Sequence, residues 1–479
     1  MRSSFETEIG HHSKRSPTAS LGPDDGEEPM KFRIRDLLQR SRGSLSILFS
    51  LPGQKRTPFM PRKKLEDLRD SRLRAMVKYA ATTVPYYQNL MRSKGLSWKD
   101  FSTVKDLNLL PTIDKATIVA DPSQFVSTSE RGQGSIQFQT SGTTGERLSV
   151  WLDRHYLLSQ AGVGRREKAV VGELLGKEVQ FKSLYISYPE STPAKIWEFY
   201  RKAAFTPIGT NRRLVSISKS LEEIVQVLDE YRPDVLMSYG SYLTLLFQFL
   251  EQKKLKCWLP GLVRFGADSL SPEGRNLIEN HFEIPVLSNY GSVECLKIGF
   301  ECGQHSGFHL HEDVCHVRIL RANGDEALPG EKGEVVISNL MNRGTVLLNY
   351  RLGDIAALSH NRCDCGRTTH TLSELEGRVE DLILLEDGKT VHPRSVWSVF
   401  KEEPRVLQYQ LIQLDQSQFE LKLVTTGKES FQEVTPTICR RLKSILGNEV
   451  IIEAKHSENV SREKSGKFRP VKSLYRRED

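Results

Sequence analysis

The sequence predicts an α/β protein with a large N-terminal domain of layered sheets and helices and a small α+β domain at its C-terminal end. Two features lead to this prediction. Short apolar runs alternate with helical patterns through most of the chain, and a strand, strand, helix, strand order closes it. Such alternation is typical of a sheet with helices packed on its faces. A chain of 479 residues is also long enough to form more than one domain.

The N-terminal part of the chain changes character after residue 29. Residues 1–29 are rich in Ser, Gly, Pro, His and charged residues and have almost no aliphatic periodicity, so we expect a disordered extension. From Leu65 to Val77 apolar residues recur at helical spacing, and Pro85 ends this helix.

Strands and helices alternate in the centre of the chain. The apolar runs 184–188 and 235–239 predict strands, and the pattern 221–228 between them predicts a helix. Ser271 followed by Pro272 begins a further helix, because Ser caps a helix and Pro fits its first turn.

The C-terminal part has a different order of elements. Apolar runs at 407–412, 419–424 and 450–453 predict strands, and a helical pattern ends by Gly447. These elements predict a compact α+β module.

Charge and cysteine content exclude several classes of protein. The 68 basic and 60 acidic residues leave a net charge of +8 without a basic stripe interleaved with aromatics, so we expect no nucleic-acid binding. Seven cysteines in a long chain without a secretory leader indicate a reducing compartment, and cytoplasmic is the expected location. The apolar run 45–51 is too short to span a membrane.

Residues 140–145 read Thr-Ser-Gly-Thr-Thr-Gly. The two glycines allow a tight turn and close approach of a ligand, while the hydroxyls and amides supply donors for phosphate oxygens. The hexapeptide therefore predicts an anion-binding loop, with an ordinary turn as the alternative.

Four later segments contain the residue types that complete a nucleotide site. Residues 289–294, Asn-Tyr-Gly-Ser-Val-Glu, follow an apolar run and place an aromatic face beside a carboxylate, so a base can stack on Tyr290 and Glu294 can hold Mg²⁺. Residues 350–354 end in a carboxylate, Asp354, after a glycine turn, which suits ribose hydroxyls.

The last two segments contribute basic groups. Residues 377–381 place Arg378 beside two acids, and residues 465–467, Ser-Gly-Lys, place Lys467 on a glycine-containing turn within a basic run. A lysine there can reach a phosphate as a point charge, although such a run is otherwise a solvated face.

Taken together and in this order, the five segments resemble the adenylate-forming superfamily of acyl-CoA synthetases, peptide-synthetase adenylation domains and luciferases, over about residues 60–479. Within it the sequence is most similar to the phenylacetate-CoA ligase group and its capsule-biosynthesis relatives. That likeness rests on Val84-Pro85-Tyr86-Tyr87, Pro233-Asp234-Val235-Leu236, Tyr239-Gly240-Ser241-Tyr242 and Gln408-Tyr409-Gln410-Leu411.

The resemblance implies a reaction in two halves. A carboxylic acid, expected to be an aryl or arylacetic acid, attacks the α-phosphate of ATP to give an acyl-adenylate and pyrophosphate, and coenzyme A then displaces AMP. The first half brings two anions together, so the machinery needs cationic donors and Mg²⁺.

The resemblance also implies roles for single residues. Thr140, Ser141, Gly142, Thr143, Thr144 and Gly145 hold the pyrophosphate portion; Asn289, Tyr290 and Gly291 bind the adenine; Glu294 binds Mg²⁺; Asp354 and Arg378 bind the ribose; Lys467 bridges the attacking carboxylate and the α-phosphate; Tyr239, Tyr242 and Gly266 lie near the acyl group. Lys467, Glu294 and Thr143 are the expected catalytic residues. Tyr239 and Tyr242 are equally expected as core aromatics.

A boundary near Glu380 fits both the element pattern and the resemblance. It divides residues 30–379, the large AMP-binding domain, from residues 380–479, a small mobile domain that rotates about Glu380 between the half-reactions. Two departures from the superfamily pattern stand out: many relatives have aspartate at the hinge, and many have proline and lysine where Glu146 and Arg147 follow the loop.

A second constellation involves sulfur. Cys363 and Cys365 lie one residue apart on a tight turn, and Cys302 and His309 lie about sixty residues upstream. Four such ligands suffice for a closed, structural Cys₃His zinc site. His305, His311 and Cys315 are alternative ligands, and reduced cysteines without a metal are the alternative interpretation.

Three questions stay open from the sequence. The acceptor is coenzyme A, an amine or a carrier protein; a nucleotide-binding protein that lost catalysis is the rival class; and the chain is a monomer or a homodimer.

Overall fold

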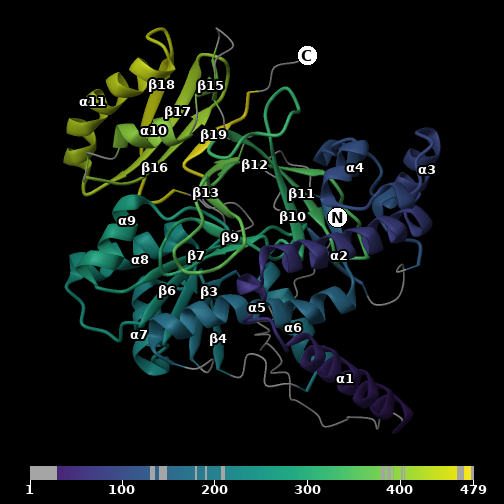
Figure 1. Ribbon diagram of the computed structural model, residues 1–479. Coiled ribbons are helices and arrows are strands. Elements are labelled where there is room, and N and C mark those ends of the chain that lie inside the picture. Colours follow the sequence, from purple (N-terminus) through teal and green to yellow (C-terminus); the bar gives the residue numbers. More distant parts are fainter. Residues whose placement is uncertain are drawn as a thin grey trace, which may run out of the picture.

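The structure is a computed structural model that describes residues 30–129, 135–139, 148–177, 181–188, 191–205, 211–378, 383–385, 390–391, 393–400, 403, 405–460 and 469–475 (Figure 1). Several predictions lie outside these residues: the extension 1–29, the loop 140–145 with Glu146 and Arg147, the hinge Glu380, and Lys467.

An eleven-stranded sheet forms the centre of the described residues, in the order β10-β11-β12-β13-β9-β8-β7-β6-β5-β3-β4. Five adjacent strands are parallel. They are β3 (Ser183–Ser187), β4 (Arg212–Ser216), β5 (Val235–Ser238), β6 (Leu262–Phe265) and β7 (Val286–Tyr290).

The other six strands are antiparallel, and β8 pairs with β7 to join the two halves. They are β8 (Gly299–Glu301), β9 (Phe308–Leu310), β10 (Cys315–Leu320), β11 (Lys332–Asn339), β12 (Tyr350–Leu358) and β13 (Thr371–Arg378). A separate hairpin pairs β1 (Ile136–Gln139) with β2 (Ser149–Leu152).

Helices cover both faces of the parallel half, as the alternating pattern predicts (Figure 1). One face packs on α7 (Leu221–Tyr231), α8 (Gly240–Lys253) and the π-helix Leu277–His281, which follows α9 (Pro272–Asn276). The other face packs on α5 (Arg154–Leu175). Helix α1 (Met30–Ser50) contacts both α5 and α6 (Thr192–Ala203). The parallel half is thus a buried sheet between two helical layers.

The antiparallel half packs on the N-terminal helices. These are α2 (Arg62–Thr83), α3 (Pro85–Ser93) and α4 (Lys115–Ala120). Tyr87 is fully buried there, and its hydroxyl accepts from the Leu348 amide at 2.8 Å and donates to the Val346 carbonyl at 3.3 Å. The predicted helix before Pro85 is confirmed.

The C-terminal module has a sheet and a hydrophobic core of its own. The strand order is β18-β17-β16-β19, and the core lies between this sheet and two helices. The elements are β14 (Ile383–Leu384), β15 (Thr390–Val391), α10 (Pro393–Phe400), β16 (Val406–Gln413), β17 (Gln418–Thr425), α11 (Lys428–Leu446), β18 (Ile451–His456) and β19 (Val471–Ser473). The strands expected near 407, 419 and 450 are confirmed.

One predicted local structure was wrong. Residues 350–354 do not form a turn but begin β12, where a register shift against β11 makes a bulge and Gly353 takes a φ of +82°. At residues 350–354 strand pairing continues past Gly353, because a bulge absorbs this glycine. The predicted position of residues 289–290 at the carboxyl end of a strand is confirmed, because Asn289 and Tyr290 are the last residues of β7.

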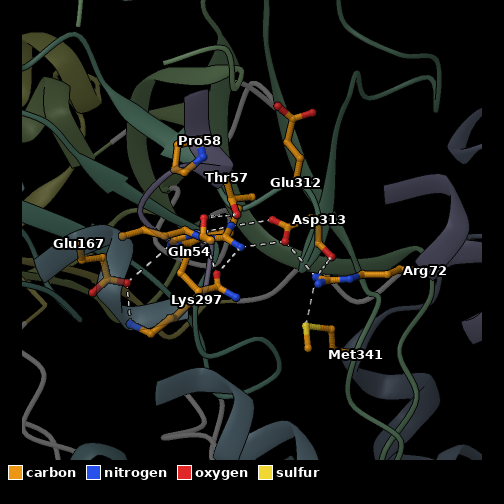
Figure 2. A network of polar contacts seen from close by, with 12 residues as sticks. Gln54, Thr57, Pro58, Arg72, Glu167, Lys297, Glu312, Asp313 and Met341 are labelled. Carbon is orange, nitrogen blue, oxygen red and sulfur yellow. Dashed lines mark hydrogen bonds and ion pairs between the residues drawn. The ribbon is translucent and has the colours of Figure 1, made fainter. Parts of the chain in front are cut away.

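A network of buried ion pairs connects α5 and α2 to the segment before β10 (Figure 2). Asp313 is 1% exposed and receives two bonds from Arg166, at 2.6 and 2.8 Å, and one from Arg72 at 2.9 Å. Gln54 accepts from Arg166 at 3.0 and 2.8 Å. Burial opposes ionisation of Asp313, but the two guanidinium groups hold its pKa at about 2.

We predict that Asp313→Asn lowers the free energy of unfolding by about 3–5 kcal/mol, because Arg166 keeps a buried charge without its partner. Urea denaturation at neutral pH measures the change. The Asp67→Asn control removes an exposed pair with Lys63 and should leave the midpoint unchanged.

The same variant should show a pH dependence of known sign. A depressed pKa stabilises the fold above the ordinary value of 3.8, and this stability is lost as the pH falls through about 2. The difference between wild type and Asp313→Asn should therefore shrink between about pH 4 and pH 2. A constant difference would contradict the assignment.

Candidate functional site

Tyr290 and Asp354 meet across the main sheet, although 64 residues separate them in the sequence. The Tyr290 hydroxyl donates to Asp354 Oδ2 at 2.7 Å. Asp354 lies opposite Arg378 in the β12–β13 register, although the side chain of Arg378 is not among those described. Three of the predicted nucleotide-binding positions thus come together at the junction of the sheet halves.

Glu294 lies buried next to this group. It is 6% exposed, and the Tyr350 hydroxyl donates to its Oε1 at 3.3 Å. Its backbone carbonyl accepts from Asn339 Nδ2 at 3.1 Å. Gly291 allows the chain to turn between Tyr290 and Glu294, because a Cβ at that position would lie 2.4 Å from the Leu296 carbonyl oxygen.

Other predicted site residues lie outside the described chain. The loop 140–145 lies between β1 and β2, whose register pairs Gln139 with Ser149. Lys467 and Glu380 are likewise not described.

The three residues expected near an acyl group lie in different surroundings. Tyr239 and Tyr242 are 5% and 4% exposed and belong to the core between the sheet and α8. Gly266 follows β6, and a Cβ there would lie 3.3 Å from the Asn289 carbonyl oxygen. Both tyrosines are thus buried in this core, and Gly266 lies against Asn289 of β7.

A buried ionic cluster beside Asn289 was not predicted. Glu167 of α5 bonds to Lys297 at 2.5 Å and to Arg264 of β6 at 3.0 Å, and Asn289 Nδ2 lies 3.4 Å from the same carboxylate. Figure 2 shows Glu167 and Lys297 beside the Asp313 network. Burial opposes ionisation of Glu167, but Lys297 and Arg264 hold its pKa well below the usual range.

The four predicted metal ligands converge at one point. The ligand atoms of Cys302, His309, Cys363 and Cys365 all lie within 4.8 Å of one another. Cys302 Sγ and Cys363 Sγ are 3.6 Å apart, and Cys365 Sγ is 3.3 Å from His309 Nε2. The edges of a tetrahedral zinc site are about 3.8 Å between sulfurs and about 3.6 Å between sulfur and nitrogen, so the donor set fits Zn²⁺.

The surroundings of His309 suit a metal ligand. Its Nδ1 contacts Thr369 Oγ1 at 3.1 Å, which leaves Nε2 to face the sulfur atoms. Burial lowers the pKa of His309 to about 4, so the ring is neutral at pH 7. The alternative ligands His305, His311 and Cys315 are not part of the group.

Comparisons with known proteins show what the sequence is similar to. A family model described as the CapK C-terminal domain matches residues 383–474. The phenylacetate-coenzyme A ligase of Thermus thermophilus is 26% identical over 419 residues, which cover 85% of this chain and 89% of the relative. That of Escherichia coli is 24% identical over 403 residues, covering 80% and 89%.

The fold has solved counterparts as well. A 2-hydroxyisobutyryl-CoA ligase in the postadenylation state, in complex with R3-HIB-AMP, has a TM-score of 0.66 at 15% identity and covers 88% of this chain and 92% of its own. The chain is similar in sequence to phenylacetate-CoA ligases and has the fold of the adenylate-forming enzymes. The match to the CapK C-terminal domain supports the predicted likeness to capsule-biosynthesis relatives, for which Gln408-Tyr409-Gln410-Leu411 was one of the motifs.

None of the described helices in this ligase homologue is long and apolar enough to cross a membrane.

We predict that the purified protein contains about one zinc per chain and that Cys363→Ser removes most of it. Loss of the metal should lower the melting temperature by about 5 °C or more, or roughly 2 kcal/mol for a domain of this size. Cys439→Ser on α11 is the control, because Cys439 is outside the group. Metal analysis and thermal melts measure both effects; chelation without a shift would favour metal-free cysteines.

Proposed function

We propose that this protein activates a carboxylic acid with ATP and Mg²⁺ to an acyl-adenylate, releases pyrophosphate and transfers the acyl group to coenzyme A. It is thus an AMP-forming acid–thiol ligase, the class of its curated relatives. The observation that carries the proposal is the convergence of Tyr290, Asp354, Arg378 and Glu294 at the junction of the sheet halves.

Each residue of that junction has a role in the proposed chemistry. The face of Tyr290 stacks on the adenine, while its hydroxyl orients Asp354 so that the carboxylate accepts from the ribose hydroxyls. Arg378 supports the ribose from the opposite strand. Glu294 is the carboxylate that would hold Mg²⁺, and Tyr350 orients it.

The residues outside the described chain complete the proposal. The loop 140–145 holds the pyrophosphate portion with its amides and hydroxyls, Thr143 among them. Lys467 neutralises charge between the attacking carboxylate and the α-phosphate. Residues 30–379 form the AMP-binding domain, and residues 380–479 rotate about Glu380 between the two half-reactions. The separate core of the C-terminal module supports movement as a unit.

Coenzyme A is preferred over an amine or a carrier protein as the acceptor because the curated relatives are named as coenzyme A ligases.

The Cys₃His group is proposed as a structural zinc site, since four protein ligands leave no position for water. An inactive nucleotide-binding protein is disfavoured because Glu294, Asp354 and Lys467 are all present.

We predict that pyrophosphate release from Mg-ATP depends on an added carboxylic acid and increases when coenzyme A is present. Lys467→Ala should lower adenylate formation by about 100-fold or more, because a transition-state charge contact is lost. Thiol transfer from a supplied acyl-adenylate should largely persist.

Two variants make this test specific. Lys464→Ala removes a lysine from the same basic run and should leave adenylate formation unchanged. Glu294→Gln should lower adenylate formation and weaken its dependence on Mg²⁺ concentration. Equal loss of both half-reactions in Lys467→Ala would contradict its role, and no pyrophosphate with any acid would contradict the proposed function.

A further inference from the structure

The buried ionic cluster on α5 lies next to the nucleotide-binding segment. Asn289, the neighbour of Tyr290 on β7, has its side chain 3.4 Å from Glu167 Oε2. Gly266 at the end of β6 contacts the Asn289 backbone. The cluster therefore lies beside the segment that we propose binds the nucleotide, and an acid activated there would lie near it. We call the following residues the Glu167 cluster: Glu167, Lys168, Arg212, Arg264, Asn289 and Lys297.

Positive charge exceeds negative charge in this cluster. Glu167 is shared by Lys297 at 2.5 Å and Arg264 at 3.0 Å, and His311 Nε2 lies 3.5 Å away. Lys168 and Arg212 form no ion pair with any carboxylate among the residues that the structure describes. Within the described residues of the cluster, the Glu167 carboxylate is thus the one negative charge beside four cationic side chains, those of Lys168, Arg212, Arg264 and Lys297.

The pKa values of Lys168 and Arg212 reflect this excess of positive charge. Burial lowers the pKa of Lys168 to about 8, with further contributions from Arg212 and Lys297. Burial and the nearby Arg264 likewise lower the pKa of Arg212. Arg212 itself keeps access to solvent. An anion stabilises cations that lower one another's pKa values in this way.

Two buried polar groups beside the cluster have no hydrogen-bond partner among the described residues. They are the side-chain amide of Gln160, which is 4% exposed, and Nε of Arg264. Gln160 lies on α5 one turn after Tyr156, whose hydroxyl accepts from the Leu296 amide, and one turn before Gly164, which faces Lys297. Because residues four apart share a helix face, Gln160 faces the same segment. Buried groups of this kind are normally satisfied by a partner.

We infer that the acid activated by this enzyme carries a second anionic group at the end opposite the reacting carboxylate, and that the Glu167 cluster binds this group. The inference rests on the proposed function and names its substrate class. Arg264, Lys297, Lys168 and Arg212 supply the cationic donors, Gln160 supplies an amide donor, and Glu167 holds Arg264 and Lys297 in position.

The same argument opposes a purely apolar substrate such as phenylacetate. An aryl ring against the cluster would remove water from four cationic side chains and return no hydrogen bond to them, which is costly for buried charge. Carboxylate and guanidinium instead form charge-assisted bonds. The aryl or arylacetic acid expected from the sequence therefore fits only if it carries a further anionic substituent.

The test compares acids that share a skeleton and differ at the far end. One set is hexanoate, hydroxyhexanoate, adipate and phosphonohexanoate; another is phenylacetate, hydroxyphenylacetate and carboxyphenylacetate. Pyrophosphate release by the full-length protein gives kcat/KM for each. In at least one set the anionic members should exceed the hydrogen and hydroxyl members by about 100-fold, because a site built for a polar group rejects an analogue that lacks it. Equal or better activity with the uncharged members of both sets would overturn the inference.

A second readout separates this inference from the proposed function. Thermal melts with AMP and each acid report binding without turnover. Stabilisation by the anionic acids alone, with no pyrophosphate from any acid, would uphold an anion site at the Glu167 cluster and reject the proposed function. The inference would be rejected if the anionic acids neither stabilise the protein more than the uncharged acids do nor release pyrophosphate faster.

A matched pair of variants assigns the preference to the cluster. Arg212 and Arg213 are neighbours on β4, but Arg212 lies on the α5 face, while Arg213 pairs with Glu230 of α7 on the other. Arg212→Gln should lower the ratio of anionic to uncharged activity at least about tenfold. Arg213→Gln should leave the ratio unchanged. Arg212 is partly exposed, so its loss should not unfold the protein; an equal ratio in both variants would overturn the assignment.

Discussion

Ion pairs made by two adjacent residues of helix α5 hold the two halves of the main sheet together. Arg166 bonds to Asp313, just before the antiparallel strand β10, while Glu167 bonds to Arg264 on the parallel strand β6 and to Lys297 between the halves. These side chains are buried or nearly so, and each partner would be strongly destabilising without the other. Such pairs favour one arrangement of the halves, and the junction between them is where the candidate nucleotide site lies.

The site depends on that arrangement because its residues come from both halves. Tyr290 ends the last parallel strand and donates to Asp354, which belongs to an antiparallel strand. A small displacement of one half would break this bond and separate Glu294 from Tyr350. The Cys₃His group likewise brings together separate segments of the chain, since Cys302 follows β8 and Cys363 and Cys365 precede β13. A metal there would join two more segments of the antiparallel half. The scaffold thus sets the positions of reacting groups through buried polar contacts as much as through the apolar core.

Much of this could be predicted from the sequence, and the failures have physical reasons. Helical and strand periodicity located the layers, and the spacing of Cys302, His309, Cys363 and Cys365 located the group of four, because a short cysteine motif and a nearby strand hairpin leave few geometries. The β12 bulge was missed because a glycine with positive φ is compatible with either a turn or a bulge. The Glu167 cluster was missed because its contacts span 97 and 130 residues and no local pattern marks a charged side chain as buried. Composition could not reveal it, since the charges look like an ordinary surface until the sheet is assembled.

The central claim is that a carboxylate attacks the α-phosphorus of ATP. The most direct measurement uses an acid whose carboxylate is labelled with heavy oxygen and analyses the released nucleotide by mass spectrometry. Attack at the α-phosphorus followed by transfer to coenzyme A moves one labelled oxygen from the acid into AMP, and the account predicts labelled AMP with unlabelled pyrophosphate. Unlabelled AMP, or ADP and phosphate in its place, would contradict adenylate formation and with it the proposed function.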